Sequence, residues 1–119
     1  MKAMNEHEII AAFYKSGALM EKAIHEGNYK LNNREAKKMY TLYKRVSASY
    51  KELFLTRCVP TMLAEGNYPT KIQTCNFLFD MQVLEKDAEE VLIRIAKEPD
   101  AKLFAHQAKL ILHERGIKL

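Results

Sequence analysis

The sequence predicts an all-α fold of about six helices arranged in three pairs. Apolar residues recur at the three- and four-residue spacing of a helix along almost all of the 119 residues, and no run alternates apolar and polar residues over the length of a strand. Three prolines and four glycines lie mostly between the periodic segments, where helices end. A chain of this length, 48% hydrophobic and 29% charged, suits one globular domain. We therefore expect a single helical-repeat domain over residues 1–119.

The first three helices are expected at residues 5–25, 29–50 and 51–65. Asn5 suits the N-cap of the first helix, because its side chain can accept a hydrogen bond from a backbone N–H of the first turn. Gly27 suits the end of that helix. Pro60 lies inside the third helix and removes one backbone donor, so we expect a kink there. Gly66 ends the third helix.

The last three helices are expected at residues 69–82, 85–98 and 101–115. Pro69 suits a first helical turn, where its missing N–H has no intrahelical partner to lose. Pro99 stops the fifth helix, and Asp100 is the expected N-cap of the last one. Gly116 closes the last helix.

Internal similarity indicates that the helices form a repeat. The four residues Glu-Gly-Asn-Tyr at 26–29 recur identically at 65–68, a shift of 39 residues. A second shift, of 33 residues, carries the apolar positions of 72–79 onto apolar positions of 105–112. Periods of about 33–40 residues, with two helices in each, are typical of an α-solenoid.

Three segments carry a resemblance to a known family: Gly-Asn-Tyr-Lys at 27–30, the helix around 59–64, and Ala-Lys-Glu-Pro at 96–99. With these segments the chain resembles a small bacterial family of unknown function whose fold is a HEAT- or armadillo-like α-α superhelix. The resemblance covers most of the chain and implies that fold. It brings no known active-site residues, and the tyrosine-rich second helix departs from the family pattern.

The apolar stripes also predict which residues form the core. Eight residues are expected to be largely buried: Ile72, Leu78, Phe79, Leu92, Ile95, Ala108, Ile111 and Leu112. Cys58 and Cys75 lie on the same stripes, and a buried free cysteine behaves as a small hydrophobic residue. We therefore expect two buried thiols and no catalytic nucleophile.

Recognisable catalytic motifs are absent from the sequence. The four glycines are isolated, so no Walker loop, GxGxxG turn or nucleophile elbow is present. His106 and His113 are about 10 Å apart along one helix, which is too far for one zinc ion. The acidic residues at 85–90 open a helix, where its N-terminal dipole favours them. We expect no enzymatic activity, no catalytic residue, no cofactor and no metal site.

The expected location is the cytoplasm. Apolar runs such as 77–79 and 91–93 are too short to cross a membrane, and mean hydropathy is −0.32. No apolar run follows the charged residues at 1–8, so we expect no signal peptide.

Charge is distributed unevenly along the chain, whose net charge is +4. Residues 30–57 contain eight basic and two acidic residues, and residues 80–100 contain three basic and seven acidic residues. A cationic strip covers an arc of about 140° on the second helix, and its members are Lys30, Arg34, Lys37, Lys38, Lys44, Arg45 and Lys51. The opposite side is expected to be an apolar stripe: Ala36, Met39, Tyr40, Tyr43, Val46 and Tyr50.

The cationic strip separates the classes of function that the sequence leaves open. The candidate partner-binding residues are Arg34, Lys37, Lys38, Lys44 and Arg45. We expect a protein-interaction module of an immunity or adaptor type. Its expected partner is a second protein with an acidic surface. Binding of nucleic acid is the alternative; the tyrosines argue against it, because they are expected on the apolar side and not as a base-stacking surface. A strip that is only a solvated helix face is the third interpretation.

Overall fold

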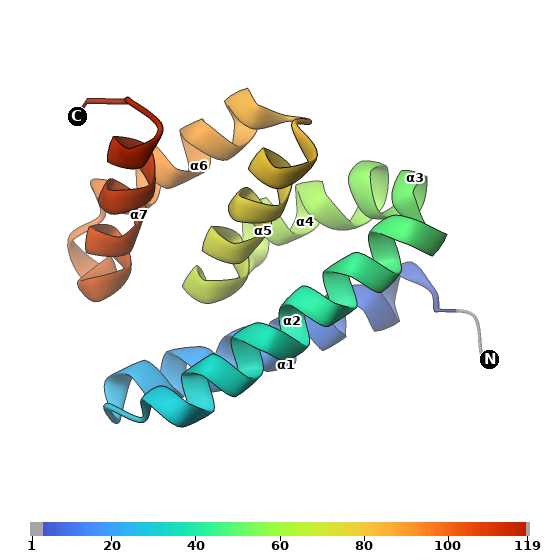
Figure 1. The fold of residues 1–119 in the computed structure, drawn as a ribbon, viewed down its shortest axis with the longest axis horizontal. Helices are drawn as coiled ribbons and strands as arrows, with labels where there is room; N and C mark the ends of the chain where they lie inside the picture. Colours follow the sequence, from blue (N-terminus) through green and yellow to red (C-terminus); the bar gives the residue numbers. More distant parts are fainter. Residues whose placement is uncertain (1–3, 119) are drawn as a thin grey trace. The chain divides into compact units, whose positions relative to one another are not determined.

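A computed structural model describes residues 4–118, and these residues form helices joined by turns, without a β-strand among them (Figure 1). The prediction of an all-α fold is confirmed. The chain divides into two compact units, the first ending at Thr70 and the second beginning at Lys71. That the whole chain is one domain, and that its helix pairs form a superhelix, stay predictions.

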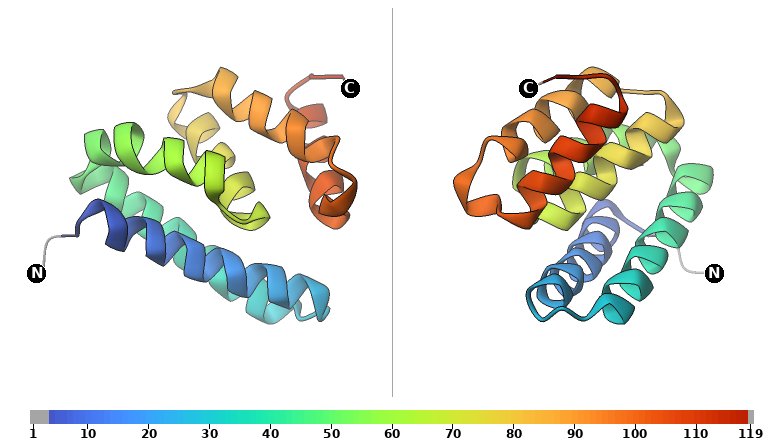
Figure 2. Two further views of the ribbon diagram at one scale, coloured as in Figure 1. Left: turned by 180° about the vertical axis from the view of Figure 1, so that it is seen from behind. Right: turned by 60° about the vertical axis from the view of Figure 1, so that its left-hand side comes forward.

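The first unit begins with a helical hairpin of α1 (Glu6–His25) and α2 (Tyr29–Ser49), which lie side by side (Figure 2). The Asn5 side chain accepts a hydrogen bond from the N–H of Glu8 at 2.9 Å, as the N-cap prediction requires. Gly27 has a φ of +70°, a left-handed conformation that glycine adopts without strain. The chain can therefore reverse within three residues, and Asn28 caps α2 by accepting from the N–H of Leu31 at 3.1 Å.

The predicted third helix is present but is not regular. It consists of α3 (Lys51–Leu53), a π-helical turn (Phe54–Cys58) and α4 (Val59–Glu65). Pro60 has no N–H to donate to the carbonyl four residues earlier. The turn before it is wider, with the Val59 N–H bonded to the Phe54 carbonyl five residues back. The expected disturbance at Pro60 therefore takes the form of a π-helical turn that precedes it.

Aromatic rings and a close backbone approach hold the first unit together. The Phe54 ring lies 5.8 Å from the Phe13 ring and 6.3 Å from the Tyr43 ring, centroid to centroid, and all three side chains are buried. The first turn of α5 (Tyr68–Met81) packs against Gly17 of α1, where an added Cβ would overlap the side-chain oxygens of Asn67 and Thr70. Glycine is therefore required at position 17 by lack of space.

Hydrogen bonds tie that first turn of α5 to the backbone of α1. The Thr70 hydroxyl donates to the Phe13 carbonyl at 3.3 Å, and the Asn67 amide donates to the Tyr14 carbonyl at 3.2 Å. Asn67 also accepts from the Thr70 N–H at 3.0 Å, which is the same capping contact that Asn28 makes with Leu31. The repeated Gly-Asn sequences therefore share their asparagine caps. The glycines differ, because Gly66 has a φ of −69°.

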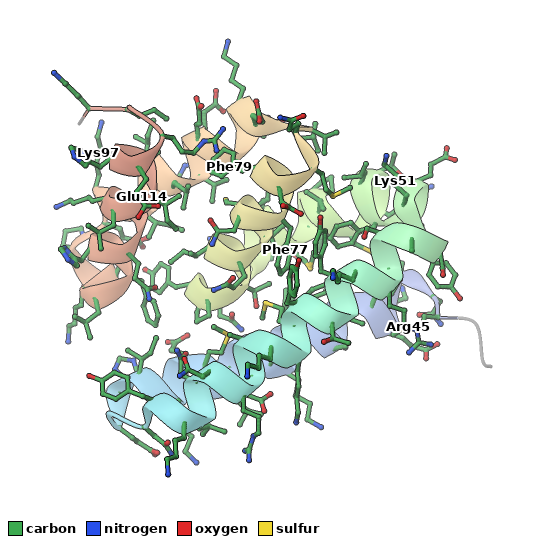
Figure 3. All side chains as sticks on the ribbon, in the orientation of Figure 1. Arg45, Lys51, Phe77, Phe79, Lys97 and Glu114 are labelled. Carbon is green, nitrogen blue, oxygen red and sulfur yellow. The ribbon has the colours of Figure 1, made fainter. Side chains whose placement is uncertain are left out.

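The second unit contains most of α5, α6 (Glu85–Ala96), a 3₁₀ turn (Pro99–Ala101) and α7 (Leu103–Glu114). Seven of the eight predicted core residues are buried, and Ile111 is only half-buried. α5 is apolar on more than one side: Phe77 and Phe79 (labelled in Figure 3) are about 200° apart around the helix, and both are buried. Gly116, with a φ of +81°, ends the last helix as predicted.

The start of the last helix differs from the prediction. We expected Asp100 as its N-cap, but Asp100 lies within the 3₁₀ turn and α7 begins at Leu103. The residue before it, Lys102, has a φ of +52° and makes no side-chain cap hydrogen bond. Pro99 explains the shift, because its fixed φ starts a tight turn before the α-helix can form.

Candidate functional site

The candidate site lies on α2, whose two sides differ sharply. Met39, Tyr43 and Val46 are buried, and they recur at the spacing of one helix face. The cations of the strip that lie on α2 are exposed on the other side. The predicted division of this helix into an apolar side and a cationic side is therefore confirmed in outline.

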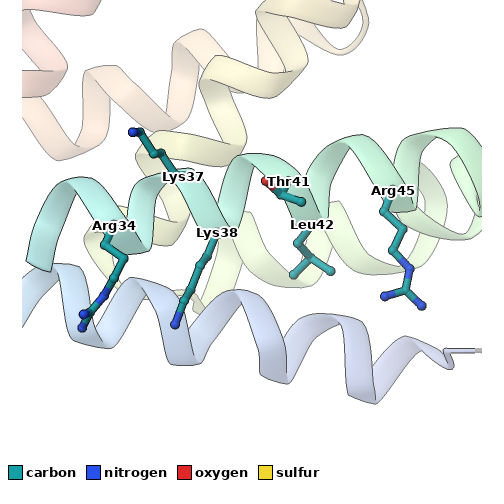
Figure 4. Close-up of a pocket in the computed structure, with 6 residues that line it drawn as sticks. All are labelled: Arg34, Lys37, Lys38, Thr41, Leu42 and Arg45. Carbon is teal, nitrogen blue, oxygen red and sulfur yellow. The ribbon is translucent and has the colours of Figure 1, made fainter.

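Four of the five candidate residues line one shallow groove on the cationic side (Figure 4). The groove has a volume of about 460 Å³, and its lining residues are Arg34, Lys37, Lys38, Thr41, Leu42 and Arg45. Residues four apart on a helix form a ridge. The lining residues are two such ridges, one of positions 34, 38 and 42 and the other of positions 37, 41 and 45. We call the space that they line the α2 groove.

A buried carboxylate lies beside the groove. The Glu35 side chain is only 3% exposed, and its Oε2 atom lies 3.2 Å from Lys38 Nζ and 3.7 Å from Arg34 Nε. Both cations are themselves more than 60% exposed. Glu35 therefore pairs with two cations that stay largely in water. The four cations of the groove against this one carboxylate leave a net charge of +3.

Lys44, the fifth candidate residue, lies outside the groove. Its Nζ atom lies 5.1 Å from the centroid of the Tyr40 ring, within the range of a cation–π contact. Tyr40 itself is 45% exposed, so the expectation that it belongs to the buried apolar stripe is wrong. Its ring lies 5.9 Å from that of Tyr43, which is buried, so Tyr40 covers the edge of the core and meets solvent on its outer side.

Lys51, another member of the cationic strip, is also separate from the groove. It begins α3, beyond the end of α2, and lines a different hollow together with Glu52 and Arg57. Arg45 and Lys51 are both labelled in Figure 3. The groove is therefore shorter than the strip that the helical wheel predicts.

Three residues of this site were missed by sequence reasoning. Thr41 and Leu42 line the groove, and the four-residue spacing that pairs them with Lys37 and Lys38 could have indicated this. The burial of Glu35 has a weaker signal in the sequence. It follows Arg34 and precedes Lys38 by three residues, a spacing that permits an ion pair on one helix.

The two cysteines are unsuited to nucleophilic chemistry. Both are free and buried, and the Cys75 thiol donates to the Ala88 carbonyl at 3.5 Å. Burial, with a smaller contribution from Glu6, raises the pKa of Cys58 to about 11. Burial raises the pKa of Cys75 to about 12. Because the thiolate is the reactive form, neither side chain is activated at neutral pH.

Residues 4–118 contain no group of three or more His, Cys, Asp or Glu side chains that could together hold a metal ion. None of their helices combines the length and the apolar character that crossing a membrane demands. Comparison with protein-family models, with curated proteins and with solved structures finds no match to this chain.

Proposed function

We propose that the chain is a non-enzymatic protein-interaction module, and that the α2 groove binds an acidic surface of another protein. In this proposal it is a bacterial, cytoplasmic, HEAT-like protein of the immunity or adaptor type. The observation that carries the proposal is the groove itself, which four cations line together with Leu42 and Thr41. A protein partner can match both features, with carboxylates for the cations and an apolar side chain for Leu42.

Nucleic-acid binding is the second candidate, and one observation favours it. Tyr40 is 45% exposed and Tyr29 is 76% exposed, so α2 presents aromatic rings beside its cations. Stacking of bases on such rings supports binding of single strands. Neither ring lines the α2 groove, however, and a sugar–phosphate backbone has no apolar group to place against Leu42. These two points favour the acidic protein.

Charge reversal of Lys37 and Arg45 tests the proposed site. These two cations are preferable to Arg34 and Lys38, because reversing either of the latter would set a new carboxylate beside buried Glu35. The matched control is Lys86→Glu with Lys109→Glu, which makes the same change in net charge at exposed positions on α6 and α7.

The measurement is the affinity for acidic peptides, by fluorescence anisotropy, at about 0.15 M salt. We expect Lys37→Glu with Arg45→Glu to weaken binding at least about tenfold, while the control pair changes it less than about threefold. The melting temperature should stay close to that of the wild type, because exposed charges contribute little to stability. Equal losses in the two variants would mean that net charge alone attracts the peptides, and the proposed site would be wrong.

A further inference from the structure

The α2 groove has the form of a helix-packing surface. Its two walls are the ridges 34–38–42 and 37–41–45, which are neighbouring rows of residues four apart on one helix. In helix–helix packing, a ridge of one helix inserts into the groove between two such rows of the other. Within the first unit, α1 packs against α2, whereas the residues of these two ridges are exposed or half-buried. These two ridges therefore leave between them a groove into which a ridge of another helix can insert.

The chemistry of the groove selects the residues that an inserted ridge would carry. Arg34 and Lys38 form one end of the first wall, and Lys37 and Arg45 bracket the second. The apolar contribution comes from Leu42, which is half-buried, beside the small side chain of Thr41. A ridge that fits this pattern has carboxylates toward both ends and a small or apolar residue at its middle.

The length of the groove also matches a helix. From position 34 to position 45, α2 advances about 16 Å, or about three turns. A partner helix crossing at an angle presents about three residues of one ridge over that length. Glu35 pairs with two cations of the first wall, because its Oε2 atom lies 3.2 Å from Lys38 Nζ and 3.7 Å from Arg34 Nε.

We propose that the partner element bound by the α2 groove is an acidic amphipathic helix, packed ridge into groove, with carboxylates at positions i and i+8 and a small or apolar residue at i+4. This inference rests on the proposed function and specifies the partner's secondary structure. An acidic segment that binds in an extended conformation, and a single-stranded nucleic acid, are the alternatives that the experiment separates.

Three peptides of about eighteen residues serve as probes. The ridge peptide is helical, with glutamates and one leucine on a single ridge. The scattered peptide has the same composition and the same helicity by circular dichroism, with its glutamates spread around the helix. The broken peptide keeps the order of the ridge peptide and has two central prolines that prevent a helix. We expect the ridge peptide to bind at least about tenfold more tightly than the other two at about 0.15 M salt.

Thr41→Trp tests the groove itself without a change in charge. Thr41 is exposed, so the substitution is compatible with folding, and the indole ring would fill the groove between the two ridges. We expect it to weaken binding of the ridge peptide about tenfold or more. Ala48→Trp is the matched control, because Ala48 is exposed on the same helix and lies outside the groove; it should leave binding within about twofold of wild type.

Each outcome has one meaning. If the three peptides bind equally and Lys37→Glu with Arg45→Glu weakens all of them, the helix inference is wrong and the proposed acidic-partner site stands. If no peptide binds, both are wrong. If a thymidine oligonucleotide binds more tightly than the ridge peptide and Lys37→Glu with Arg45→Glu abolishes that binding, these cations belong to a nucleic-acid site, and both are wrong.

Discussion

The guanidinium carbon of Arg115 lies 3.7 Å from the centroid of the Phe79 ring. The same guanidinium group also contacts Glu85, with 3.5 Å between Nη2 and Oε1. These contacts connect the end of α7 to the last turns of α5 and the first turn of α6, so three helices of the second unit meet at one cation. The ion pair is partly exposed and contributes little by itself, whereas the ring is 9% exposed and belongs to the core.

Phe79→Ala should therefore destabilise the protein far more than Arg115→Ala. Loss of a buried phenyl ring removes its transfer free energy and leaves a cavity, and we expect the free energy of unfolding to fall by about 3–5 kcal/mol. Arg115→Ala removes only the cation–π contact and the exposed ion pair, at about 1 kcal/mol. Urea denaturation measures both changes. An unaltered urea midpoint for Phe79→Ala would show that Phe79 is not a core residue. The predicted alignment of residues 72–79 with residues 105–112 would then also be wrong.

Gly17→Ala should also destabilise the protein, although alanine ordinarily favours a helix over glycine by about 1 kcal/mol. The new Cβ would overlap the side-chain oxygens of Asn67 and Thr70. Relieving that overlap would break the hydrogen bonds from these side chains to the α1 backbone, so we expect a net loss of about 1–3 kcal/mol. The melting temperature, measured by thermal unfolding, shows whether the substitution destabilises the protein. Any rise in melting temperature would mean that the first turn of α5 does not pack on α1 as described.

Local chemistry explains which parts of the fold could be predicted. The helix ends at Asn5, Gly27 and Gly116 depend on a cap or on a left-handed backbone, and both are properties of single residues. The start of α7 at Leu103 and the π-helical turn at 54–58 depend on how the chain accommodates a proline, for which several backbone solutions exist.

In the candidate site, too, spacing along one helix predicts some features, and others depend on tertiary packing. The cations could be assigned to one helix face from spacing alone, and four of the five candidates do line one groove. The burial of Glu35 and the exposure of Tyr40 depend on where the edge of the core falls, which spacing along α2 does not determine. Both residues lie on the boundary between the buried and the exposed face of α2, where a small rotation of the helix would decide whether a side chain is buried or exposed.

Lys38→Ala should cost more stability than Lys37→Ala, although both lysines are exposed and adjacent. Removing Lys38 takes away the nearer partner of the buried Glu35 carboxylate, and an underpaired buried charge is costly. We expect a loss of about 1–2 kcal/mol for Lys38→Ala and less than about 0.5 kcal/mol for Lys37→Ala. In a Glu35→Gln background the difference should largely disappear. If it persists there, Lys38 stabilises the protein by another route.

Cys58 and Cys75 should react slowly with a thiol reagent in the native protein and rapidly after unfolding. Both thiols are buried, and their pKa values are raised to about 11 and about 12. Raised values mean that the native state holds the thiol protons more tightly than the unfolded state does, so this contribution to stability is present below about pH 9 and is lost as the pH rises through about 11 to 12. The free energy of unfolding should fall more steeply above pH 9 in the wild type than in a Cys58→Ala, Cys75→Ala variant. Fast labelling of either native thiol at neutral pH would instead point to an activated cysteine.

The salt dependence of binding should separate an acidic helix from a phosphate backbone. A single strand that neutralises the four groove cations would lose affinity with a log–log slope of about −3, because each phosphate contact releases counterions. An acidic peptide has no comparable condensed counterion layer, and we expect a shallower slope that arises mainly in the association rate.

Tyr40→Ala adds an independent test, since removing an exposed ring that stacks on a base should weaken oligonucleotide binding by about 1–3 kcal/mol. We expect no measurable oligonucleotide binding near 0.15 M salt and an unchanged peptide affinity in Tyr40→Ala. Micromolar oligonucleotide binding at that salt, lost in Tyr40→Ala and kept in Tyr40→Phe, would reverse the order of the two candidate functions.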